Sequence, residues 1–134
     1  MKNVLIIAVL MFAFGNAFAG ATLAITLSPI ASATRLLQSA TVTSLAPFAS
    51  TFVVAQSRGV AGREQIKDEL VALNDDMVSG AVKTIDQVRQ PALKELFAEI
   101  AANDAQMREI SSAVKEGSKL HRIATAVTVA LLAE

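Results

Sequence analysis

Charged residues divide this chain into three zones, and this division limits the folds that the chain can adopt. Residues 20–62 carry only two charges, Arg35 and Arg58, whereas residues 63–122 carry nine basic and eleven acidic residues. After this zone the only charged residue is Glu134. Because charged side chains are seldom buried without partners, we expect a solvated middle zone and two covered apolar flanks. A hairpin of charged helices that brings the flanks together satisfies both conditions.

The middle zone has the spacing of amphipathic helices. Apolar residues recur every three or four positions in two stripes: Ile66, Leu70, Leu73 and Met77, then Leu93, Leu96, Phe97 and Ile100. This spacing places each stripe on one face of an α-helix. Ser79-Gly80 is a plausible end of the first helix, although the apolar pattern can also continue through Val88. Pro91 then either starts the second helix or kinks a continuous one.

Two further helices are expected before the end of the chain. Asn103-Asp104 can cap the first of them, which carries Met107, Ile110 and Val114. Gly117-Ser118 has the order of a helix stop followed by an N-cap, which predicts a last helix running to about Ala133. That helix is apolar nearly all round, so it is expected at the centre of the core or against a partner.

The first flank is harder to interpret. Residues 22–27 alternate in a way that favours a short strand before Pro29, and residues 36–45 are ambiguous. A helix over residues 47–57 is expected, opened by Pro47 and stopped by Gly59.

The expected architecture is therefore mainly α: a small helical bundle or helical hairpin. Amphipathic charged helices form its centre, and three to five antiparallel helices lie between about residues 47 and 133. We expect a helical domain over residues 47–134. The Ala/Ser/Thr-rich flank over residues 20–46 is expected to be irregular or partly strand.

The first nineteen residues have the order of a secretory signal peptide. Lys2 precedes an apolar run over residues 4–14, and Ala17-Phe18-Ala19 provides small residues for cleavage before Gly20. This predicts an exported protein with residues 1–19 removed, in the periplasm or secreted, most consistent with a bacterial envelope. In the alternative interpretation, residues 4–27 stay attached as a transmembrane anchor, since this run is long enough to span a bilayer.

The composition excludes several classes of function. The chain has no Cys, so thiol nucleophiles, disulfides and Cys-ligated metals are ruled out. It also has no Trp or Tyr, which argues against aromatic stacking platforms for bases or sugars. Without its leader the chain has eleven basic and twelve acidic residues, so no basic surplus suggests nucleic-acid binding.

His121, the only histidine, is a candidate proton shuttle or ligand, but no second His or Cys accompanies it. We therefore interpret it as a helix-surface or boundary histidine. Asp75-Asp76 and the pair Glu95 and Glu99 are the best carboxylate clusters, and Glu95 and Glu99 share a helical face. Neither cluster has EF-hand or Glu-x-x-His spacing, so both are interpreted as solvated surface charges.

Two other patterns lack the motifs of a catalytic or phosphate-binding site. The Ser and Thr residues between positions 22 and 57 include no Gly-x-Ser-x-Gly elbow, and the stretch 58–63 lacks the Gly-Lys-Ser/Thr ending of a phosphate-binding loop. We interpret residues 58–63 as a simple turn before a helix. The sequence therefore assigns no catalytic, cofactor-binding or metal-ligating residue, and no small-molecule substrate is evident.

The function that fits these observations is non-enzymatic: an adaptor, envelope-associated factor or assembly component. It would bind a protein partner, or a second copy, through its apolar flanks. The membrane-anchored protein is the first alternative. Polymerisation through the β-prone residues 22–27 or 125–132 is another. A metal- or phosphate-dependent enzyme has the least support.

Overall fold

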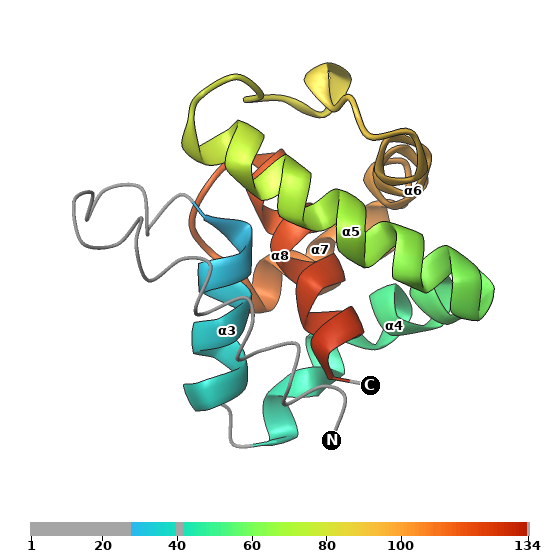
Figure 1. Ribbon diagram of the computed structural model, residues 1–134. Helices are drawn as coiled ribbons and strands as arrows, with labels where there is room; N and C mark the ends of the chain where they lie inside the picture. The colour runs from blue at the N-terminus through green and yellow to red at the C-terminus, as the bar shows by residue number, and fades with distance from the viewer. Residues whose placement is uncertain (1–27, 40–41, 134) are drawn as a thin grey trace.

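The computed structural model describes residues 28–39 and 42–133, and these residues form six α-helices and two short 3-10 helices. Figure 1 shows their arrangement. The α-helices are α3 (Pro29–Ser39), α4 (Ala49–Gln56), α5 (Gly59–Val78), α6 (Pro91–Ala101), α7 (Asp104–Ala113) and α8 (Lys119–Leu132). The 3-10 helices are η1 (Val42–Phe48) and η2 (Ile85–Gln87). The prediction of a mainly α protein is confirmed.

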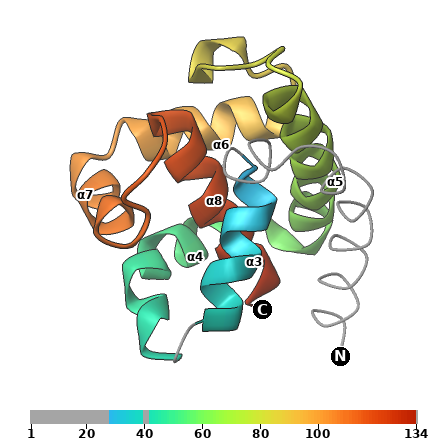
Figure 2. The same ribbon diagram turned by 90° about the vertical axis from the view of Figure 1, so that its left-hand side faces the viewer.

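Helix α8 is the centre of the bundle. The other α-helices surround it in Figure 2, and every residue from Leu120 to Leu132 except Arg122 is buried. Of its two buried threonines, Thr128 donates a 2.7 Å hydrogen bond from its hydroxyl to the Ala124 carbonyl one turn earlier, whereas the Thr125 hydroxyl has no hydrogen-bond partner among the described residues. The expectation of a central helix that is apolar nearly all round is confirmed, and residues 125–132, weighed above as β-prone, are helical.

The start of α8 follows from two residues. Gly117 has a φ of 91°, a conformation that glycine adopts without the steric penalty of a side chain. Ser118 is the N-cap, and its hydroxyl accepts a 3.1 Å hydrogen bond from the backbone N–H of His121. The predicted cap at Ser118 is confirmed, but the preceding helix α7 already ends at Ala113, so the predicted helix stop at Gly117 is wrong.

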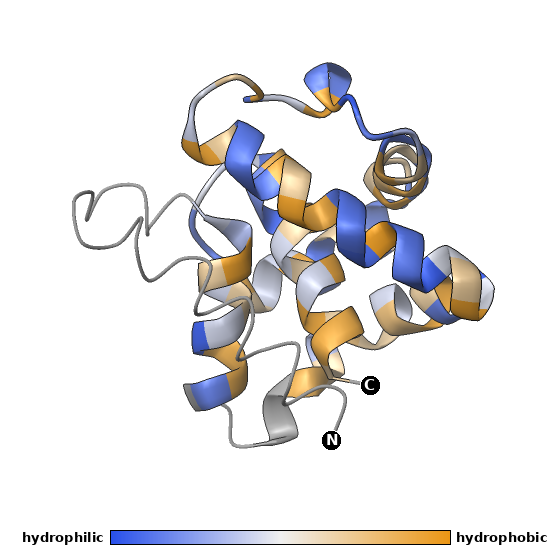
Figure 3. Cartoon of the chain, in the orientation of Figure 1, coloured by the Kyte–Doolittle hydropathy of each residue, from blue (hydrophilic) through white to orange (hydrophobic). Residues whose placement is uncertain are grey.

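The predicted apolar stripes form the interior faces of the surrounding helices. Ile66, Leu70 and Leu73 of α5 are buried, as are all four apolar stripe residues of α6. Helix α5 ends at Val78, followed by Gly80 with a φ of 83°, and α6 begins at Pro91. Figure 3 shows hydrophilic residues recurring along α5, whereas the C-terminal half of α8 is mostly apolar.

Helix α7 begins as its sequence predicts. Asn103 is its N-cap, and the Asn103 side chain accepts a 3.0 Å hydrogen bond from the backbone N–H of Gln106. Ile110 is buried on its inner face, but so is Gln106, which the apolar pattern did not include. The Gln106 side chain donates a 3.2 Å hydrogen bond to the Thr51 hydroxyl of α4, which satisfies a polar group inside the core.

The first flank differs from its prediction. Residues 29–39 form helix α3, so the expected irregular or strand conformation is wrong for them. Pro29 opens the helix, and α3 packs along α8, so this part of the first flank and the last zone cover one another as expected (Figure 2). The predicted strand over residues 22–27 lies outside the described residues.

The α4 region agrees with the prediction except at its boundaries. Helix α4 covers Ala49–Gln56 rather than residues 47–57, because Pro47 lies inside the preceding 3-10 helix. Gly59, with a φ of 77°, separates α4 from α5. Helix α5 begins at Gly59 itself, so the interpretation of residues 58–63 as a turn is wrong from Gly59 onward.

The predicted leader, its cleavage position and the alternative anchor over residues 4–27 all lie outside the described residues. Among the helices that the structure describes, none has the length and apolar composition needed to cross a bilayer.

Candidate functional site

His121 is placed in a polar pocket that its sequence context did not reveal. It lies in the first turn of α8, at the boundary of the charged zone as expected, but its side chain is only 6% exposed, so the surface interpretation is wrong. Its Nε2 atom lies 3.2 Å from Oγ of Ser32 in α3. Ser32 is itself 9% exposed, so this polar pair is buried between α3 and α8.

Arg35 extends this contact toward solvent. Its Nη2 atom donates a 3.3 Å hydrogen bond to Ser32 Oγ, one turn earlier in α3. Because a guanidinium group can only donate hydrogen bonds, Ser32 Oγ is the acceptor in this contact. The Ser32 hydroxyl hydrogen can then be donated to Nε2 of His121, with the imidazole in the tautomer that accepts there.

These three residues line a pocket of about 340 Å³ between α3 and the segment that joins α7 to α8. Leu36 of α3 and Val114 contribute apolar walls, while Lys115 and Glu116 contribute charged side chains. Arg35, Lys115 and Glu116 are exposed, whereas Ser32 and His121 are buried, so the exposed charged side chains lie at the mouth and the buried polar side chains at the floor.

The imidazole of His121 also lies close to Gly117. A Cβ atom at Gly117 would lie 2.6 Å from Cδ2 of His121, too close for the ring to stay in place. The backbone of Gly117 therefore packs directly on the ring. Beyond it lies a second pocket, of about 370 Å³, lined by His121 together with residues such as Met77, Val82 and Lys83.

The carboxylate pairs do not form sites. Asp75 is exposed, while Asp76 accepts hydrogen bonds from Arg89 Nη2 at 2.8 Å and Gln90 Nε2 at 3.1 Å. Asp76 therefore ties the segment after α5 back onto that helix. Within the described ranges, no group of three or more His, Asp or Glu side chains is arranged to hold a metal ion.

Glu95 and Glu99 are both exposed on α6, as expected for solvated charges. Glu99 forms an ion pair with Arg58, which precedes α5. Arg58 therefore connects the start of α5 to α6, and Gly62 lies one turn after it, where a Cβ atom would meet Cβ of Arg58 at 3.0 Å. The close approach to Arg58 accounts for glycine at position 62, and the ion pair with Glu99 accounts for arginine at position 58. Both residues of this stretch therefore have structural roles.

An apolar groove lies at the opposite end of α8. It has a volume of about 410 Å³, and its lining residues are all uncharged. They are Leu45, Phe48, Ala49, Phe52, Val53, Val129, Ala130 and Ala133. The groove therefore joins η1 and α4 to the C-terminal end of α8, and the walls offer only aliphatic and aromatic contacts.

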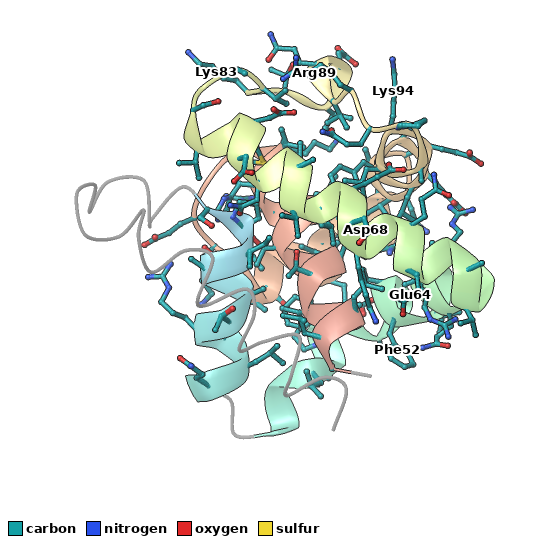
Figure 4. The ribbon with its side chains drawn as sticks, viewed as in Figure 1. Phe52, Glu64, Asp68, Lys83, Arg89 and Lys94 are labelled. Carbon is teal, nitrogen blue, oxygen red and sulfur yellow. The ribbon has the colours of Figure 1, made fainter. Side chains whose placement is uncertain are left out.

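Apolar side chains are also exposed beside this groove. Val53 is 66% exposed and Phe52 is 37% exposed, both on α4. In Figure 4, Phe52 lies on the same side of the molecule as Glu64 and Asp68 of α5, while Lys83, Arg89 and Lys94 lie along the top of the view. Glu64 forms a 3.6 Å ion pair with Lys67, so the charge at this border is partly balanced.

Sequence reasoning missed Ser32 and the groove for the same reason. Ser32 and His121 are 89 residues apart, and the groove combines residues from η1, α4 and α8. The sequence shows that the first flank is rich in Ala, Ser and Thr. This composition does not identify which serine contacts His121.

No protein-family model, curated protein or solved structure matches this chain.

Proposed function

We propose that this protein is a non-enzymatic, exported helical protein that acts through protein contacts, and that the partner in its apolar groove is a second copy of the chain. The observation that supports this proposal is the groove between α4 and the end of α8, with the exposed Val53 at its edge. Exposed apolar surface of this kind is common at sites of protein association.

The groove and its edge are suited to a symmetric contact. In a two-fold interface the same patch occurs on both subunits, so one patch must supply both a protrusion and a recess. Val53 is the protrusion, because two thirds of its surface is exposed, and Val129 and Ala130 form part of the recess. Because the described lining residues are all uncharged, two copies of the groove itself bring no like charges together.

The contact would be held mainly by burial of apolar surface. Each square ångström of apolar surface removed from water contributes about 25 cal/mol before the entropy of association is subtracted. Phe52 is the largest exposed side chain of the patch, and aromatic residues in fully covered pockets often dominate such contacts. The groove is lined by eight of the described residues, fewer than the roughly 20 to 30 per partner of a standard stable interface, so we propose a reversible dimer rather than an obligate one.

Sedimentation velocity of the protein, purified as the cell processes it, tests this proposal. We expect a concentration-dependent dimer in the micromolar range that Val53→Glu converts to a monomer, since the exposed position tolerates the charge in the folded monomer. The matched control is Val71→Glu, because Val71 is 40% exposed on α5 and does not line the groove. It should leave the dimer intact.

Two other results distinguish the alternatives. If the protein is a monomer that binds an apolar dye, and Val53→Glu abolishes this binding, the groove is exposed and does not bind a second copy. The partner would then be a different protein. A monomer with no dye binding at high micromolar concentration would contradict the interaction function itself.

Export is proposed on separate grounds. It is supported by Lys2, the apolar run of residues 4–14 and the small residues at positions 17 and 19. If residues 4–27 are retained instead, the protein would be anchored in the membrane and would bind its partner through the same groove.

A further inference from the structure

The pocket that contains Ser32, Arg35 and His121 has the features of a ligand site, independently of the groove. We propose that it binds a small, singly charged carboxylate with a short aliphatic chain. The proposal uses residues from α3, from the segment after α7 and from the first turn of α8.

Arg35 supplies the group that would recognise the carboxylate. Its guanidinium reaches inward far enough to hydrogen-bond Ser32 Oγ, although the residue is exposed. A guanidinium presents its N–H donors in a planar fork that matches the two oxygens of a carboxylate. The fork is therefore positioned between solvent and the floor of the pocket, where an entering anion would first meet it.

The floor offers polar atoms in an otherwise apolar interior. Ser32 and His121 are both at least nine-tenths buried, and their side chains lie 3.2 Å apart. A buried pair of this kind adjoining a pocket of about 340 Å³ can rearrange its hydrogen bonds toward a ligand oxygen without exposing the core. The imidazole also packs closely on Gly117, where a Cβ atom would lie 2.6 Å from its Cδ2 atom.

The charges at the mouth favour a single negative charge on the ligand. Arg35 and Lys115 are cationic and Glu116 is anionic, so the mouth has an excess of one positive charge. A dianion would be neutralised only in part and would lie close to the Glu116 carboxylate. A monoanion balances the excess without this repulsion.

The apolar walls of the pocket favour an aliphatic chain attached to the carboxylate. Leu36 is partly buried and packs against the core, and Val114 is buried. A short aliphatic chain placed against these two residues would be removed from water, whereas a fully hydrated inorganic anion would gain nothing from them. The pocket therefore favours a short-chain carboxylate over inorganic phosphate.

His121 provides a direct probe, because it is the only histidine in the chain. In a ¹H–¹³C spectrum of the untagged protein, its imidazole gives a single spin system. We would titrate butyrate, inorganic phosphate and butanol at constant pH and ionic strength. Butyrate should shift the His121 resonances saturably, whereas phosphate and butanol should not.

Two variants locate the site. Arg35→Gln should raise the butyrate dissociation constant about tenfold, because it removes a charge-assisted hydrogen bond. Lys115→Gln should weaken binding by a smaller factor. The matched control, Arg108→Gln, changes the same charge at an exposed position of α7 outside the pocket and should not alter binding.

Three results would overturn the proposal. The first is a shift that grows linearly with butyrate, or that sodium chloride reproduces. The second is saturable binding of phosphate as tight as that of butyrate, which would contradict the carboxylate class. The third is unchanged butyrate affinity in both Arg35→Gln and Lys115→Gln, with the folded spectrum retained.

Discussion

The side chain of Asn74 in α5 holds the N-terminus of α3: its Oδ1 atom accepts a 2.7 Å hydrogen bond from the Ser28 hydroxyl. The same oxygen accepts the backbone N–H of Ile30 at 3.1 Å. Ser28 Oγ in turn accepts the N–H of Ala31 at 3.2 Å. All of these groups are buried, so two residues 46 positions apart satisfy the first turn of α3 where water cannot.

Asn74→Ala should therefore destabilise the protein more than the loss of one surface hydrogen bond would. The substitution leaves the Ser28 hydroxyl and the Ile30 N–H without their acceptor in a buried place. We expect the free energy of unfolding to fall by about 2 to 4 kcal/mol. Urea denaturation followed by circular dichroism measures this change. As a control, Asn103→Ala removes a cap at an exposed position of α7 and should cost about 1 kcal/mol.

Leu96→Ala tests the packing of α6. Leu96 is almost completely buried, so the substitution removes apolar contacts and leaves a cavity. The free energy of unfolding should fall by about 2 to 5 kcal/mol. Val60→Ala is the comparison, because Val60 is largely exposed at the start of α5, and its effect should stay within about 0.5 kcal/mol of zero. If Leu96→Ala were silent, the helices would not be packed as described.

Gly117→Ala separates steric conflict from backbone strain. Gly117 and Gly80 both have a positive φ, of 91° and 83°, so alanine is strained at either position. A Cβ atom at Gly117 would collide with the His121 ring at 2.6 Å, whereas a Cβ atom at Gly80 would have no atom nearer than Cε of Lys83 at 4.0 Å. We expect Gly80→Ala to cost about 1 to 2 kcal/mol.

Gly117→Ala should cost at least about 1 kcal/mol more, in the range typical of overpacking. It should also shift the His121 imidazole resonances, which Gly80→Ala should leave in place. Equal destabilisation by the two substitutions, with unmoved His121 signals, would show that the ring is not confined by Gly117.

The proposed export can be measured directly. After expression of the full chain in a bacterial host, the intact mass of the product should correspond to a species that begins at Gly20 and is recovered from the soluble envelope fraction. Ala19→Arg should block cleavage because the site requires a small residue, whereas Asn16→Gln, outside the small-x-small site, should not. A wild-type product that begins at Met1 and stays in the membrane pellet would instead support the retained anchor.

Much of the helical pattern could be predicted because its causes are local in sequence. The burial of Leu93, Leu96 and Ile100 follows from a repeat of three and four residues. The starts of α6 and α8 follow from Pro91 and Ser118, which act on their own first turns. The end of α5 follows from Gly80, whose positive φ suits a residue without a side chain.

Helix α3 and the two candidate sites depended on contacts between distant residues. Residues 29–39 belong to the flank that the sequence predicts to be irregular or partly strand, and Asn74 and α8 provide the contacts that stabilise these residues as a helix. Neither Ser32 nor His121 has a neighbour in sequence that signals a site.

The sequence by itself therefore determined the charged and apolar zones, the stripes and several helix boundaries, because these depend on interactions over a few residues. The tertiary structure decided that α3 is a helix, that His121 is buried against Ser32, and that α4 and α8 enclose a groove. These outcomes require chain segments up to 89 residues apart to meet, and the free energy of their contacts exists only once the core has formed.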